Sequence, residues 1–137
     1  MMYRAAASVG CDAYSGTAHM GDFRRLVAWQ QANAYAVAVH AAFAGRKADA
    51  ATGSRAQILR AVSSIPDALA EGCAKRSREE LARYADIAYG SAKEVEGQLI
   101  KARDLGLLSA TEAEDLLRLG DRVSRLCFGL ARPPKPP

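Results

Sequence analysis

The sequence contains few cysteines and no long apolar run. Cysteine occurs only at Cys11, Cys73 and Cys127 in a chain of 137 residues. An odd count without the spacing of metal ligands argues against a secreted disulfide framework and against a cysteine-based metal site. We therefore expect reduced thiols in a cytoplasmic protein. No run of about eighteen apolar residues occurs, so we expect no contact with a membrane.

The residue patterns that support catalysis are also missing. The two histidines are His19 and His40, and neither belongs to a Glu-x-x-His pair of the kind that builds di-iron bundles. No glycine-rich phosphate loop follows a strand, because no segment is rich in β-branched or aromatic residues. Aromatic residues make up only 7% of the chain. We expect no enzyme, no catalytic residues, no cofactor and no metal.

The remaining composition is that of one globular helical domain. Hydrophobic residues account for 50% of the chain and charged residues for 25%, and alanine and leucine favour helix. Residues 1–21 are rich in glycine and small polar residues and are predicted to form a flexible leader. Residues 132–137 are rich in proline, which cannot continue a helix, and form an extended tail. The folded domain is therefore expected over residues 22–131.

Four helical segments are predicted inside this domain, at about 22–44, 54–73, 77–105 and 111–130. Asp22 is the expected N-cap of the first, and Ser77 with Glu80 forms a capping box at the third. Ser109 and Thr111 compete as the cap of the fourth. Short connections between amphipathic helices predict an all-α, antiparallel up-down-up-down four-helix bundle.

Apolar residues at helical spacing predict which face of each helix is buried. For the first helix the stripe is Phe23, Leu26, Gln30, Ala34, Val37 and Ala41. For the second it is Ile58, Val62, Ile65, Leu69 and Cys73, for the third Leu81, Ala85, Ala88, Ala92, Val95, Leu99 and Ala102, and for the fourth Leu116, Leu119, Val123, Leu126 and Leu130.

Basic residues gather near the predicted ends of the bundle. The net charge is only +4, so their position is more informative than their number. One end collects Arg24, Arg25, Lys75, Arg76 and Arg78, and Arg55 and Arg60 lie toward the other. Arginine-rich ends can contact the phosphates of nucleic acid. An alternative interpretation explains the same pattern: these charges lie at helix ends only to keep the protein in solution.

Small and aromatic residues suggest a surface for self-association. Ala88, Gly90, Ser91 and Ala92 would let another helix approach closely. The four aromatic residues Trp29, Tyr35, Tyr84 and Tyr89 cannot all fit inside so small a bundle. We expect some of them on a second apolar face that contacts another copy of the chain.

Several ordered motifs resemble one protein family. Ser64-Ile65-Pro66-Asp67-Ala68-Leu69-Ala70-Glu71-Gly72 is similar to the signature Ser-Ile-Pro-Ala-Asn-Ile-Ala-Glu-Gly of proteins encoded in intervening sequences of bacterial 23S ribosomal RNA genes. The segments 23–32, 57–62, 76–80 and 87–96 resemble the family in the same order. The family's asparagine aligns with Ala68, which is a departure from its pattern.

This resemblance implies a four-helix bundle that assembles into a homo-oligomer, typically a pentamer, with a basic surface for RNA or DNA. Relatives include the accessory variability determinant of diversity-generating retroelements, which implies a reverse transcriptase as a possible partner. Within the signature, Pro66 is expected to kink its helix, Glu71 to pair with Lys75, Arg76 or a basic residue on a neighbouring helix, and Gly72 to permit a tight turn. A structural or protein-interaction bundle without nucleic-acid contact is the alternative.

Overall fold

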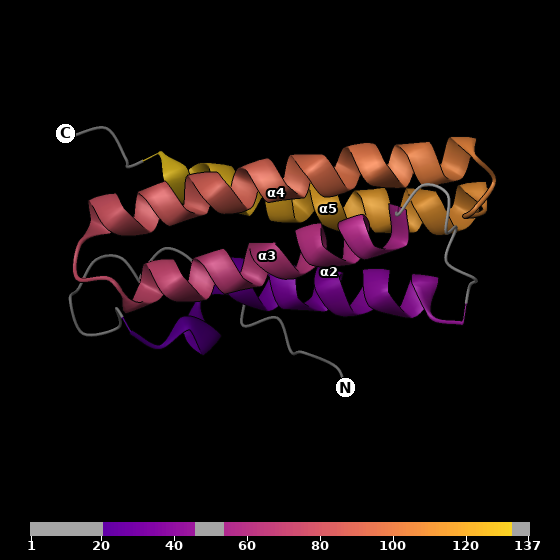
Figure 1. The fold of residues 1–137 in the computed structure, drawn as a ribbon. Coiled ribbons are helices and arrows are strands. Elements are labelled where there is room, and N and C mark those ends of the chain that lie inside the picture. The colour runs from indigo at the N-terminus through magenta and orange to yellow at the C-terminus, as the bar shows by residue number, and fades with distance from the viewer. Residues whose placement is uncertain (1–20, 46–53, 133–137) are drawn as a thin grey trace.

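The computed structural model describes residues 21–45 and 54–132, and these form an all-α up-down bundle (Figure 1). The elements in chain order are a short 3-10 helix η2 (Phe23–Arg25) and the helices α2 (Val27–Phe43), α3 (Ser54–Ala74), α4 (Arg78–Asp104) and α5 (Ala110–Ala131). The predicted fold class is confirmed. Nearly all of the predicted leader, most of the tail and residues 46–53 between α2 and α3 lie outside the described residues.

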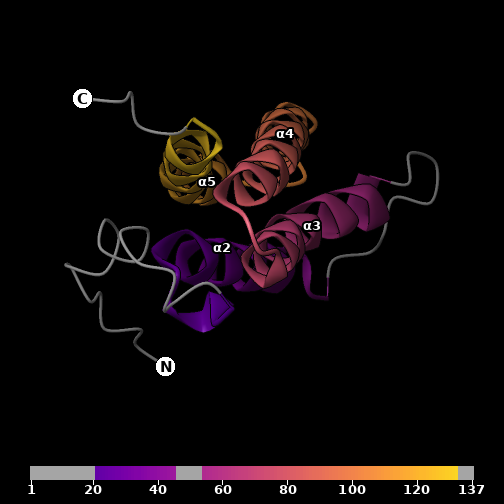
Figure 2. The same ribbon diagram turned by 90° about the vertical axis from the view of Figure 1, so that its left-hand side faces the viewer.

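Each helix packs against its neighbour in the sequence, and α2 also packs against α5. Consecutive helices run in opposite directions, so the four close into a ring around one core (Figure 1). Seen from the end, α3 is inclined to the other helices and diverges from α2 (Figure 2). This arrangement brings η2, the α3–α4 turn and the end of α5 to the same end of the bundle.

The first helix is divided, which the sequence pattern did not predict. The Asp22 carboxylate accepts a hydrogen bond from the Arg24 backbone N–H and caps η2, not a long helix. Leu26 then adopts an extended conformation, with ψ of 118°, and its side chain is buried. The break lets Leu26 reach the core and allows α2 to begin at Val27.

The other helix ends largely follow the predicted chemistry. The Ser77 hydroxyl accepts from the Glu80 backbone N–H and caps α4, but the Glu80 side chain does not complete the predicted capping box. Ser109, not Thr111, caps α5, and with Glu112 it forms the complete reciprocal capping box. At the end of α4 Gly106 adopts φ of 76°, and the Leu107 N–H returns 2.8 Å to the Ala102 carbonyl. This is the glycine-dependent Schellman ending.

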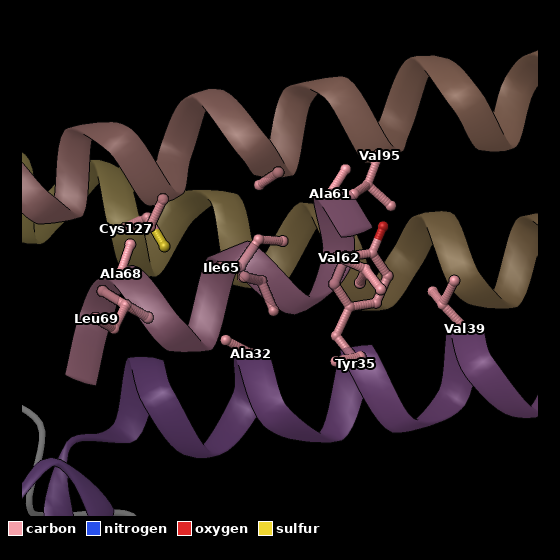
Figure 3. Close-up of a cluster of buried hydrophobic side chains, with 14 of the residues drawn as sticks. Ala32, Tyr35, Val39, Ala61, Val62, Ile65, Ala68, Leu69, Val95 and Cys127 are labelled. Carbon is pink, nitrogen blue, oxygen red and sulfur yellow. The ribbon is translucent and has the colours of Figure 1, made fainter. Parts of the chain in front are cut away.

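The predicted buried stripes of α3 and α4 are confirmed at every position, but those of the other two helices are partly wrong. Val37 of α2 is 61% exposed, whereas Tyr35 crosses the core and is 1% exposed (Figure 3). Leu119 of α5 is partly exposed, and Gly120 and Ser124 are buried instead. In α2 alanine and valine occupy most positions, so spacing alone allowed more than one buried face.

No helix in the described part of the chain combines the length and the apolarity that crossing a membrane requires.

Candidate functional site

The predicted cluster of basic residues assembles at one end of the bundle. There η2 packs against α3, and Asp22 lies close enough to α3 to affect Cys73. Burial raises the pKa of the Cys73 thiol, and the negative charge of Asp22 adds to that rise. We call this set of Arg24, Arg25, Lys75, Arg76 and Arg78 the basic end; the end of the bundle with the α3–α4 turn faces the viewer in Figure 2.

The side chains of the basic end are mostly exposed to solvent. The Arg24 Nε donates to Asp22 at 3.0 Å. This bond is the main reason that the pKa of the Asp22 carboxyl is lowered and that of Arg24 is raised. The Lys75 ammonium lies 5.4 Å from the centre of the Tyr84 ring. Arg76 is exposed and forms no ion pair with any described residue. Arg76 is therefore available to a negatively charged partner.

Acidic residues lie among the same helix ends. Glu79 and Glu80 occupy the first turn of α4, where carboxylates stabilise the helix dipole. Glu71 is exposed near the end of α3. The predicted ion pair of Glu71 with Lys75, Arg76 or a neighbouring helix is not seen among the described residues. Acids therefore reduce the positive potential of this surface.

Arg55 and Arg60 do not join the basic end. Both lie in the first two turns of α3, and Arg60 is exposed. Fourteen residues of α3 lie between Arg60 and Lys75, which corresponds to about 21 Å at a rise of ~1.5 Å per residue. The predicted basic residues thus form two separate surfaces.

The signature segment of α3 has a packing role at most of its positions. Ile65 is fully buried, Pro66 is buried inside the helix, and Ala68 is also buried (Figure 3). The Ser64 Oγ lies 2.7 Å from the Ala61 carbonyl and 2.7 Å from the Ser91 Oγ of α4. One hydroxyl has one proton, so Ser64 donates to one of these atoms only, and Ser91 supplies the other bond when Ser64 donates to Ala61.

Gly72 serves helix packing, and a turn also begins at this residue, since the Lys75 N–H donates to the Gly72 carbonyl at 3.2 Å. It is buried within α3 and does not have a positive φ. A β-carbon at this position would lie 2.8 Å from the Tyr84 Cβ and 3.1 Å from the Leu81 Cδ1. Only glycine lets α4 approach α3 this closely.

The predicted self-association surface is mostly internal. Ala88 and Ala92 are buried in the chain's own core, and Ser91 is occupied by Ser64. Gly90 is the one exposed member of that set, and nothing lies within 4 Å of a β-carbon built there. Of the four aromatic residues singled out, Tyr35 is buried in the core and Trp29, Tyr84 and Tyr89 are half-buried. The second apolar face that would contact another copy stays a prediction.

Two shallow pockets were not found from the sequence. One of about 340 Å³ lies between α2 and α3, beside Pro66, and includes His40 and Asp67. The other, of about 240 Å³, lies between α4 and α5. Sequence spacing does not reveal them because each pocket combines residues from two helices.

The described residues contain no group of three or more His, Cys, Asp or Glu side chains that could hold a metal ion. Cys73 and Cys127 are buried free thiols, and Cys11 lies outside the described residues. Burial raises the pKa of Cys127 to about 12. Thiols of this kind are poor nucleophiles at neutral pH.

Comparison with known proteins gives one family and one fold. Residues 24–129 match the sequence profile described as 23S rRNA-intervening sequence protein. No curated protein matches the chain. A crystal structure of a protein of unknown function from the S23 ribosomal protein family of Bacteroides thetaiotaomicron superposes with a TM-score of 0.71. It is 18% identical, and the match covers 78% of this chain and 100% of that one.

Proposed function

The chain belongs to the 23S rRNA-intervening sequence protein family, and on that premise we propose that it is a non-catalytic, oligomeric protein that binds nucleic acid through the basic end. The observation that carries this proposal is the grouping of Arg24, Arg25, Lys75, Arg76 and Arg78 from separate elements at one end of the bundle. Phosphates along a nucleic acid backbone need several cations within a short distance, and side chains from different elements provide them.

The surface is suited to contact with backbone phosphates. Of its ion pairs, the one between Arg24 and Asp22 is largely exposed, and exposed pairs contribute little to stability. Arg24 can therefore exchange Asp22 for a phosphate at low cost. The neighbouring acids Glu71, Glu79 and Glu80 reduce the net charge, so we expect moderate affinity that falls steeply with salt.

Self-association would bring several basic ends together. The outer side of α4 carries Ile87, which is 53% exposed. It also carries Gly90 and Gly97, where an added β-carbon would have no atom within 4 Å. A second copy, in an assembly that we expect to be a pentamer, could pack on this side. Several weak sites on one assembly would then bind one nucleic acid with increased overall affinity.

The experiment is RNA binding by the full chain, measured by fluorescence anisotropy at several salt concentrations. The test variant combines Arg24→Gln, Arg25→Gln, Arg76→Gln and Arg78→Gln. A matched control carries the same loss of charge at exposed positions elsewhere, as Lys101→Gln, Arg103→Gln, Arg118→Gln and Arg122→Gln. Circular dichroism and light scattering check that both variants keep the fold and the oligomer.

We expect the test variant to bind RNA much more weakly and with a much smaller salt dependence, and the control to change little. Each phosphate that the variant no longer neutralises reduces the slope of log K against log salt by about 0.7 to 0.9. Equal weakening in both variants would show that net charge, not the basic end, drives binding. An additional Arg55→Gln, Arg60→Gln variant tests the second basic surface in the same assay.

The alternative function is a protein-interaction bundle, such as an accessory subunit for a reverse transcriptase, with no direct nucleic-acid contact. The exposed apolar side chains of Val37 and Ile87 favour it, since large exposed apolar groups often mark protein interfaces. Absence of RNA and DNA binding at low salt, with the oligomer intact, would support this alternative over the basic-end proposal.

A further inference from the structure

The pocket between α4 and α5 combines aromatic rings, cations and a buried hydroxyl. It measures about 240 Å³, below the ~300–1,000 Å³ of sites for drug-sized ligands. Its size therefore suits part of a larger ligand. The pocket is lined by Tyr89 and Lys93 of α4 and by Asp121, Ser124, Arg125 and Phe128 of α5.

Ser124 provides a polar group that lacks a partner. Its side chain is only 3% exposed, and its Oγ forms no hydrogen bond with the described residues. A buried hydroxyl in this condition destabilises the protein, because its hydrogen bonds to water are not replaced on folding. A ligand group that offers a donor or an acceptor inside the pocket would replace them.

The aromatic residues provide a surface for a flat ring. The centres of the Tyr89 and Phe128 rings lie 5.6 Å apart with a tilt of 59°, and Phe128 is 40% exposed. Lys93 Nζ lies 5.6 Å from the centre of the Tyr89 ring. The Arg132 guanidinium lies 3.7 Å from the centre of the Phe128 ring. Surface aromatic rings flanked by cations are typical of sites where unpaired bases stack.

The cations of the pocket are held only loosely by acids. Lys93 pairs with Glu96 at 3.0 Å, and Arg125 pairs with Asp121 at 3.0 Å. All four side chains are more than 40% exposed. Exposed pairs of this kind contribute little, so both cations can turn to a phosphate.

The location of the pocket connects it to the basic end. Phe128 lies one turn before the end of α5, and that end lies beside the start of α4 (Figure 1). Arg132 follows directly at the end of the helix. A nucleic acid strand bound at the basic end could continue past Arg132 into the pocket.

We propose that this pocket holds one unpaired nucleotide of a single-stranded nucleic acid. The base packs on Tyr89 and Phe128, its edge hydrogen-bonds with the Ser124 hydroxyl, and the adjoining phosphates contact Lys93 and Arg125. Bases in a duplex are stacked and paired and cannot enter, so the pocket selects single strands. This inference rests on the proposed function, because it names the form of nucleic acid that the same assembly would bind.

The test measures how tightly the full chain binds two fluorescently labelled nucleic acids. One is single-stranded oligoadenylate, and the other is the duplex that oligoadenylate forms with oligouridylate. The variants are Tyr89→Leu, Phe128→Leu and Ser124→Ala, with Leu119→Ala as a control at a partly exposed apolar position of the same helix. Loss of a ring should weaken single-strand binding by about 5- to 100-fold. Loss of the hydroxyl should weaken it by about 2- to 10-fold. Duplex binding and the control should be unchanged.

Ser124→Ala gives a second readout that separates binding from folding. Removing an unpartnered buried hydroxyl should leave the free protein as stable as before or more stable, while single-strand binding weakens. Weaker binding that accompanies loss of stability would therefore count against the proposal.

The outcomes distinguish this proposal from the proposed function. Single-strand binding that survives both ring variants but disappears on changing the basic end would overturn the pocket and leave the proposed function intact. Absence of any nucleic acid binding by the unmodified chain would overturn both. A change in oligomer mass in the ring variants would instead identify the pocket as a contact between protein chains, and would also overturn the proposal.

Discussion

Gly72 of α3 and Tyr84 of α4 lie so close that a β-carbon at position 72 would be 2.8 Å from the Tyr84 Cβ. This close packing fixes how the start of α4 meets the end of α3. It therefore sets the position of Lys75, Arg76 and Arg78 in the turn between the two helices. Gly72, the last residue of the signature, thus shapes the surface that we propose for nucleic acid.

Gly72→Ala should destabilise the protein, although alanine favours helix. Placing an extra methyl group against atoms that cannot easily move costs about 1–3 kcal/mol. The higher helix propensity of alanine offsets up to about 1 kcal/mol of this cost. We expect the free energy of unfolding to fall by about 1–2 kcal/mol, measured by urea unfolding with circular dichroism as the signal. The matched control is Gly90→Ala, where nothing lies within 4 Å. It should be neutral or stabilising, and equal losses in both variants would contradict the role of close packing.

Gly120 and Tyr35 should show strong energetic coupling. A β-carbon at position 120 would lie 2.5 Å from the Tyr35 hydroxyl oxygen and 2.8 Å from the ring carbon that carries it. Gly120→Ala should therefore destabilise the protein by about 1–3 kcal/mol. Tyr35→Phe removes a buried hydroxyl without a partner and should recover part of this loss in the double variant. Strictly additive unfolding free energies would contradict this close approach.

Ser64 and Ser91 should contribute to stability as a pair. Replacing either with alanine removes their shared bond of 2.7 Å, at a cost of about 0.5–1.5 kcal/mol. The double variant should lose less than the sum, because both single variants remove the same bond. Ser63→Ala, one residue away on the same helix, is the control. An additive result in thermal unfolding would show that the two hydroxyls act independently.

Ser109→Ala should remove the cap of α5 and cost about 0.5–2 kcal/mol. Both halves of the capping box, from Ser109 and from Glu112, are present in the structure. Thr111→Ala should have little effect, because Thr111 lies after the cap and is exposed. The reverse order of the two losses, measured in urea, would assign the cap to Thr111.

Cys127 should make stability depend on alkaline pH. Burial raises its pKa from 9.0 to about 12, so the folded protein keeps the thiol proton that the unfolded chain releases. This contribution is complete below the unfolded pKa and decreases as the pH rises toward the folded pKa. The unfolding free energy should therefore fall between pH 9 and 12. Under reducing conditions Cys127→Ala should show a shallower fall, and an unchanged slope would contradict the assignment.

Local sequence chemistry determined most of the fold. Caps at Ser77 and Ser109 and the glycine at position 106 set helix ends, because these depend on residues close in the sequence. The stripes of α3 and α4 identified their buried faces, because polar residues on the other side left one choice. The same logic failed in α2, where alanine on every side left Tyr35 and Val37 equally plausible as core residues.

The basic end was partly determined by the sequence and partly by tertiary structure. The order of antiparallel helices was enough to place Arg24 and Arg76 at the same end. Three other features depended on how the helices meet. These are the distance between Arg60 and that end, the packing role of Gly72, and the lack of an ion pair between Glu71 and any described residue. The pocket with the buried Ser124 hydroxyl likewise exists only once α4 and α5 are packed. The sequence by itself determined where the helices lie and which residues cap them. Contacts between helices decided the sites, because each site draws its residues from more than one element.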